Sequence, residues 1–99
     1  MSKIIFEVNY NVIPEKRGEY LELIDKLKDL IREKTTPEYY VMENRKISNN
    51  FSEYYMFEDE EDFENMEDNQ DDEINDLIQQ LFDEFIVNNK VIYTTRQEV

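Results

Sequence analysis

Residues 3–13 read KIIFEVNYNVI, and apolar and polar side chains alternate along this stretch. One side of the alternation is apolar and holds Ile4, Phe6, Val8, Tyr10 and Val12. The other side is mixed and holds Ile5, Glu7, Asn9, Asn11 and Ile13. A period of two predicts a β-strand with one face toward a core.

A helix is expected directly after this strand. Pro14 suits the first turn of a helix, where its missing N–H costs nothing, and Glu15 and Glu19 lie near the positive end of the helix dipole. The helix is predicted to run to about Lys34. Its apolar positions recur at spacings of three and four, which gives one buried stripe of Tyr20, Leu23, Ile24, Leu27, Leu30 and Ile31.

Two strands follow the helix. The stretch EYYVMENRKI (38–47) is rich in Tyr and Val, and FSEYYMFE (51–58) has the same character. We expect them to form a hairpin whose turn contains Ser48, Asn49 and Asn50.

The next stretch, FEDEEDFENMEDNQDDE (57–73), is acidic. Asp59 is expected to cap a helix with Phe63 and Met66 facing inward, and Asp71 or Asp72 to cap a second helix. The second helix has apolar positions at helical spacing, namely Ile74, Leu77, Ile78, Leu81, Phe82, Phe85 and Ile86. We interpret most of these acids as helix starts and solvated helix faces.

Asn88 and Asn89 are expected to end that helix, and residues 90–99 (KVIYTTRQEV) to form the last strand. The predicted order is β-α-β-β-α-β, with the second helical region split in two. This is the ferredoxin-like α+β arrangement, a four-stranded antiparallel sheet with the helices on one face. The length of 99 residues predicts a single domain over 1–99.

The composition and the net charge exclude several classes of function. The net charge is −14, and between Lys46 and Lys90 there are 15 acids and no base, so we expect neither nucleic-acid nor membrane binding. The chain has no cysteine and no histidine, which excludes thiol catalysis and Ser-His pairs, and we expect no metal and no cofactor. The segment DNQDDEIN has alternating Asp68, Gln70 and Asp72 but lacks the glycine and closing glutamate of a calcium loop. No signal peptide or membrane span is predicted, and a soluble cytoplasmic protein is expected.

The sheet face away from the helices is expected to expose aromatic and aliphatic groups whichever strand parity applies. Such a surface usually marks an interface. Two sheets packed face to face would form a homodimer with a cavity between them.

The chain resembles the dimeric α+β barrel superfamily, and within it the antibiotic-biosynthesis-monooxygenase-like group. The resemblance is carried by FEVNYNVIPEKRGEYLELI (6–24), YYMFEDEEDFENM (54–66) and NNKVIYTT (88–95). This family contains cofactor-free oxygenases of aromatic substrates, haem-degrading members and many members with no assigned activity. The histidine that ligates haem iron in the degrading members is absent here, so the resemblance implies cofactor-free oxygenation at most. Met66 stands where members often have a histidine, and Asn9 is similar to a polar residue that some members point into the cavity.

The candidate site residues follow from these patterns. Glu7 and Asn9 share one strand face and are the catalytic candidates, with structural hydrogen bonding as the alternative. Arg45 and Arg96 are arginines predicted on strands, either to hold an anion or to pair with Glu7 or Glu43. Tyrosines gather at positions 39, 40, 54, 55 and 93, and Tyr40, Tyr54 and Tyr93 are the candidates to stack on an aromatic ligand.

Two hypotheses remain open. The first is a homodimer that binds a small aromatic or hydrophobic molecule between its sheets, as a cofactor-free oxygenase or isomerase, with Glu7 or a tyrosine as base and Asn9 holding an oxyanion. The second is a non-catalytic dimer with a packed interior, whose acidic half serves solubility or a basic partner.

Overall fold

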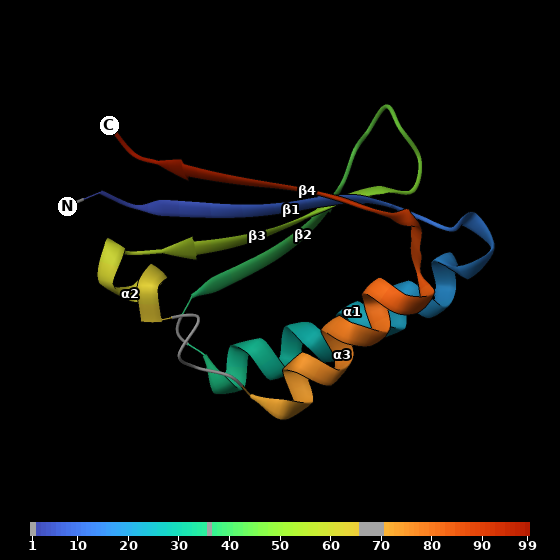
Figure 1. The fold of residues 1–99 in the computed structure, drawn as a ribbon, viewed down its shortest axis with the longest axis horizontal. Helices are drawn as coiled ribbons and strands as arrows, with labels where there is room; N and C mark the ends of the chain where they lie inside the picture. Colours follow the sequence, from blue (N-terminus) through green and yellow to red (C-terminus); the bar gives the residue numbers. More distant parts are fainter. Residues whose placement is uncertain (1, 36, 66–70) are drawn as a thin grey trace.

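The strands and helices follow the predicted order. The computed structural model describes residues 2–35, 37–65 and 71–99 (Figure 1). The elements in chain order are β1 (Ile4–Val12), the 3₁₀ helix η1 (Pro14–Lys16), α1 (Arg17–Lys34), β2 (Glu38–Glu43), β3 (Asn50–Phe57), α2 (Glu60–Asn65), α3 (Asp72–Glu84) and β4 (Ile86–Gln97). The strands form an antiparallel sheet in the order β2-β3-β1-β4, which confirms the ferredoxin-like prediction.

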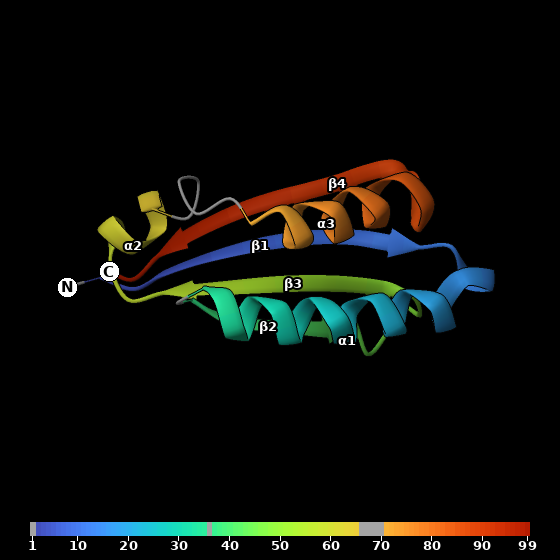
Figure 2. The ribbon, with the colours of Figure 1, turned by 90° about the horizontal axis from the view of Figure 1, so that it is seen from below.

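Helices α1 and α3 cover the same face of this sheet (Figure 2). The apolar side of β1 points toward them, since Ile4, Val8, Tyr10 and Val12 are all buried. The α1 stripe is buried at Tyr20, Leu23, Ile24, Leu27 and Ile31, and α3 contributes Ile74 and Leu81. The apolar face of the strand and the apolar stripes of the helices therefore pack into one core, as the sequence predicted.

Two acids of the stretch 57–73 cap the N-termini of α2 and α3. The Asp59 side chain accepts a hydrogen bond from the Asp62 backbone N–H at 2.9 Å, and Asp71 accepts one from the Ile74 N–H at 3.1 Å. Asp71, rather than Asp72, is thus the cap of α3. These carboxylates satisfy N–H groups that a helix start leaves unpaired. Met66 lies outside the described residues.

The hairpin between β2 and β3 differs from the prediction. β2 ends at Glu43, and the Asn44 side chain accepts hydrogen bonds from the backbone N–H groups of Lys46 and Ile47, which bends the chain into a turn. Arg45 therefore lies in a loop and not on a strand. Asn49 has φ 65°, a left-handed conformation that asparagine tolerates, and Asn50 already belongs to β3.

The last strand begins earlier than predicted. Phe85 is the C-cap of α3, and Ile86 pairs with Val12 at the start of β4, so placing Ile86 on the helix was wrong. Asn88 and Asn89 have φ 55° and 54°, and the β1–β4 register shifts between Tyr10 and Val12. The two asparagines form an irregularity inside the strand instead of a helix stop.

The other face of the sheet has no helix over it within the described part of the chain (Figure 1). It exposes apolar side chains on both outer strands, with Tyr40 at 43%, Met42 at 56% and Ile92 at 52% exposure. This is the open face. Among the described helices, none is long and apolar enough to cross a membrane.

Candidate ligand cavity

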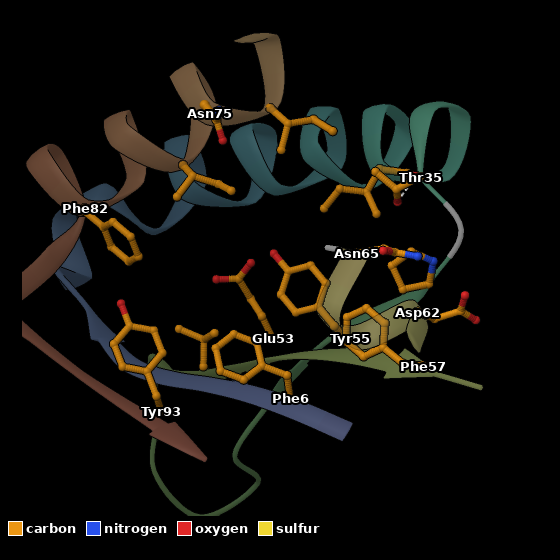
Figure 3. Close-up of a pocket in the computed structure, with 15 residues that line it drawn as sticks. Phe6, Thr35, Glu53, Tyr55, Phe57, Asp62, Asn65, Asn75, Phe82 and Tyr93 are labelled. Carbon is orange, nitrogen blue, oxygen red and sulfur yellow. Dashed lines mark hydrogen bonds between the residues drawn. The ribbon is translucent and has the colours of Figure 1, made fainter. Parts of the chain in front are cut away.

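A cavity of about 280 Å³ lies between the sheet and the helices, near the end of the sheet where α2 lies (Figure 3). Its walls are mostly aromatic and aliphatic, and a few polar groups come from α2, α3 and the α1–β2 connection. The lining residues are Phe6, Val8, Ile31, Thr35, Pro37, Glu53, Tyr55, Phe57, Asp62, Asn65, Ile74, Asn75, Ile78, Phe82 and Tyr93. An apolar hollow with few polar groups is the usual form of a small-molecule site.

Glu53 is a carboxyl buried in the wall of this cavity. It lies in the middle of β3, opposite Val8 and Val41, and is 3% exposed. The Tyr39 hydroxyl donates a hydrogen bond of 2.5 Å to Glu53 Oε1. Burial raises the pKa of Glu53, and hydrogen bonds from Tyr39, Tyr10 and Tyr55 oppose the rise. No lysine or arginine within residues 2–35, 37–65 and 71–99 forms an ion pair with it.

Tyrosine hydroxyls surround this carboxyl. Tyr10 from β1 and Tyr20 from α1 share a hydrogen bond of 2.7 Å, and both rings are buried. Burial raises the pKa of Tyr10, Tyr20, Tyr39 and Tyr55 above the ordinary value for phenols. These phenols therefore stay protonated and act as hydrogen-bond donors to Glu53 or to one another.

Aromatic rings form the floor of the cavity on the sheet. Phe6 packs against Tyr55, with ring centroids 6.1 Å apart, and stacks on Tyr93 at 5.8 Å with an interplanar angle of 9°. Tyr55 in turn contacts Tyr39 at 4.9 Å. Aromatic faces suit a flat ligand, because stacked rings bury much area at a small cost in side-chain entropy.

The predicted site residues divide between the two faces of the sheet. Glu7, Tyr54 and Tyr40 lie side by side in one row of the open face, and Asn9 and Arg96 lie in neighbouring rows. Tyr93 lies on the opposite face, where it lines the cavity (Figure 3). The structure therefore groups the predicted residues Glu7, Asn9, Tyr40, Tyr54 and Arg96, and separates them from Tyr93 and from Arg45.

Glu7 and Asn9 bond to neighbouring polar groups in the same sheet. The Ser52 hydroxyl donates to Glu7 Oε2 at 2.9 Å, and the Asn9 amide nitrogen donates to Ser52 Oγ at 2.9 Å and to Asn50 Oδ1 at 3.1 Å. The expected pairing of Glu43 with Arg45 or Arg96 is wrong. Arg17 from the start of α1 holds Glu43 with two hydrogen bonds of 2.5 and 2.8 Å.

Sequence reasoning missed Glu53. A signal for it was present, because Glu53 has the same strand parity as Phe51, Tyr55 and Phe57. An acid within an apolar strand face is either exposed at the edge of the sheet or buried with hydrogen-bond partners, and the buried case marks a position to examine. The parity of β3 was left open at the sequence level, and with it the side to which Glu53 points.

Metal binding finds no support in the described part of the chain. No group of three metal-ligating side chains comes together within residues 2–35, 37–65 and 71–99. Of the alternating residues in DNQDDEIN, which lack the pattern of a calcium loop, Asp72 is exposed at the start of α3, and Asp68 and Gln70 lie outside the described residues.

Comparison with known proteins shows the fold. No family model and no curated protein matches the chain. A conserved protein from Methanosarcina mazei Go1 is 15% identical with a TM-score of 0.82, over 100% of this chain and 95% of that one. A structure described as an antibiotic biosynthesis monooxygenase is 15% identical with a TM-score of 0.76, over 100% of this chain and 99% of that one. Protein SO0527 from Shewanella oneidensis is 15% identical with a TM-score of 0.76, over 98% of this chain and 91% of that one.

These neighbours share the ferredoxin-like α+β fold of this chain, and one of them is described as an antibiotic biosynthesis monooxygenase, so the predicted resemblance is confirmed at the level of the fold. The TM-scores establish the architecture of the chain, whereas at identities of this size the activity has to be argued from the cavity itself.

Proposed function

We propose that the protein binds a small, flat, largely apolar molecule in the cavity between the sheet and α1 and α3. The observation that carries the proposal is Glu53, a carboxyl buried in the wall of an aromatic cavity. A volume of about 280 Å³ is near the lower limit of roughly 300 Å³ for ligand pockets, so it suits an aromatic ligand of two or three fused rings.

Burial of the Glu53 carboxyl costs free energy that its neighbours have to offset. A carboxylate out of water is unfavourable by several kcal/mol unless it gains compensating partners. The described partners of Glu53 are neutral tyrosines rather than cations. An apolar side chain at this position would pack against Val8 and Val41 without that cost. A buried acid with a shifted pKa in a cavity is a typical functional group.

The chemistry that fits is proton transfer from a phenol or enol of the ligand. Glu53 would accept the proton, and the hydroxyl of Tyr55 would orient the same oxygen. An electron-rich phenolate can then reduce dioxygen itself, so one phenol and one O₂ yield one quinone and one water without a protein cofactor. The structural neighbour described as an antibiotic biosynthesis monooxygenase supports this reaction class.

We further propose that two copies pair through the open face. Exposed Tyr40 and Met42 on β2 and exposed Ile92 on β4 flank a polar middle of this face, and a partner sheet would remove these apolar side chains from water. Glu7, Asn9 and Arg96 would then lie in the interface. The two sheets of that dimer would enclose either a second ligand site or a packed, non-catalytic interface. Both alternatives stay predictions.

Ligand binding is tested by thermal denaturation and native mass spectrometry with 1-naphthol as the probe. We expect a dimer whose unfolding midpoint rises with naphthol concentration, because a ligand that binds the folded state stabilises it by mass action. The control is Glu22→Gln on the exposed side of α1, which should respond like the wild type. An unchanged midpoint at saturating naphthol would contradict the proposed site, and a monomer at micromolar concentration would contradict the dimer.

A further inference from the structure

The charges around the cavity are all of one sign. Two of its described lining residues are acids, Glu53 in the sheet and Asp62 on α2, and none is a lysine or arginine. Glu53 lies deepest, at 3% exposure, whereas Asp62 is half-buried (Figure 3). An anionic ligand would therefore enter without a cation to meet it.

We infer that Glu53 makes the cavity selective by charge: it accepts uncharged ligands that donate a hydrogen bond, and it admits an anionic ligand only together with one proton. This inference rests on the proposed function. It adds the class of ligand and names Glu53 as the residue that determines it.

The physical basis is repulsion between the carboxylate of the ligand and that of Glu53, which is 3% exposed and therefore weakly screened by water. Like charges a few ångströms apart in a low-dielectric site cannot both stay ionised, and one of them retains a proton. That proton comes from solvent and forms an O–H bond at a carboxyl oxygen, while no other bond breaks. Tyr39 already donates its own hydrogen to Glu53 Oε1. A neutral hydroxyl ligand needs no proton, because it donates to the same carboxyl directly.

Other titratable groups face Glu53 or the cavity from nearly every element. They are Tyr10 on β1, Tyr39 on β2, Tyr55 on β3, Tyr93 on β4, Tyr20 on α1 and Asp62 on α2, and the described lining residues of α3 do not titrate. Phenols in water titrate near pH 10, and burial takes Tyr10, Tyr20, Tyr39 and Tyr55 higher still. Asp62 is thus the remaining carboxyl among these groups, and its variant serves as the comparison for Glu53.

Three probes of one shape test the inference, namely naphthalene, 1-naphthol and 1-naphthoate. Their dissociation constants are measured by isothermal titration calorimetry between about pH 5 and about pH 8. We expect naphthol to bind more tightly than naphthalene. We also expect the affinity for naphthoate to fall by up to about tenfold per pH unit above the pKa of Glu53, while the affinity for naphthalene stays constant.

Variants assign the effect to one residue. Glu53→Gln is nearly isosteric, and its amide oxygen can still accept the Tyr39 hydrogen bond, so naphthoate binding should lose its pH dependence. Asp62→Asn should keep the wild-type dependence, and so should the Glu22→Gln control. Naphthoate binding that is independent of pH in the wild type, or equally dependent in Glu53→Gln, would overturn the inference.

A second measurement needs no variant. Calorimetry of the wild type in two buffers of different ionisation enthalpy gives the number of protons taken up per ligand bound. We expect up to one proton with naphthoate and none with naphthalene at a pH where naphthoate binding weakens. If naphthalene and naphthol bind but naphthoate takes up no proton, this inference fails and the proposed function stands; if no probe binds, both fail.

Discussion

Replacing Glu53 by glutamine should change how stability depends on pH. Burial raises the pKa of Glu53, so the folded state holds this proton more tightly than the unfolded chain does. The stability that the protonated carboxyl contributes is complete below the unfolded pKa of about 4.5 and is lost as pH rises through the folded pKa. Glutamine does not titrate, and its side chain keeps the oxygen that Tyr39 contacts.

The magnitude follows from linkage. One pKa unit corresponds to about 1.36 kcal/mol, so between the two pKa values the wild type loses about 1.4 kcal/mol per pH unit relative to Glu53→Gln. From about pH 5 to about pH 7 the relative loss is therefore at most about 2.7 kcal/mol, two units of about 1.36 each. The other carboxylates titrate alike in both proteins, so the difference between the two isolates position 53.

The assay is urea denaturation followed by circular dichroism, at one protein concentration because dimerisation would shift the midpoint. Wild type and Glu53→Gln are compared at several pH values across this range. We expect the variant to gain stability relative to wild type as pH rises. A difference that is constant with pH, or one that favours the wild type at higher pH, would refute the assignment of a raised pKa to Glu53.

Three further perturbations test the fold. Leu81→Ala on α3 removes a side chain that is 0% exposed and should lower the free energy of unfolding by about 2–5 kcal/mol in urea, whereas a loss below 1 kcal/mol would mean that Leu81 is not in the core. Tyr20→Phe removes the hydroxyl bonded to Tyr10 and should cost about 0.5–1.5 kcal/mol, with Tyr54→Phe on the open face as the control. Arg17 lowers the pKa of Glu43 to about 2, so Glu43→Gln should be less stable than wild type near pH 7, and the gap should close as pH falls from about 4.5 to about 2; a gap that persists in acid would argue against the ion pair.

Most of the architecture could be predicted from the sequence, because hydrophobic periodicity and helix-capping residues are local signals. The alternation in residues 3–13 correctly grouped Val8 and Tyr10 on one face of β1 without deciding which face meets the helices, and the acidic stretch correctly marked the starts of α2 and α3. Ile86 was misplaced because an apolar residue continues a helical spacing as well as it starts a strand. Arg45 was misplaced because the turn at Asn44 depends on side-chain hydrogen bonds that composition does not reveal.

The site was harder to predict, because it depends on which parity of β3 faces the helices. Tyr54 and Tyr55 are adjacent and chemically identical, yet Tyr54 lies on the open face and Tyr55 lines the cavity. Pairing with β1 decides between them, since Tyr55 lies opposite Phe6 and Glu53 opposite Val8. That pairing joins positions far apart in the chain, and it determines that the Glu53 carboxyl points toward the helices. Local sequence patterns do not contain this information.

Carbon-13 NMR of labelled glutamate side chains during a titration with 1-naphthol tests most directly whether the ligand site lies between the sheet and the helices. Glu53 and Glu7 lie on opposite faces of the same sheet, and Glu53→Gln and Glu7→Gln assign their carboxyl signals. We predict that naphthol shifts the Glu53 carboxyl signal in proportion to site occupancy and leaves that of Glu7 in place. A Glu53 signal that does not move while naphthol binds, or a shift at Glu7 alone, would contradict the placement of the ligand site between the sheet and the helices.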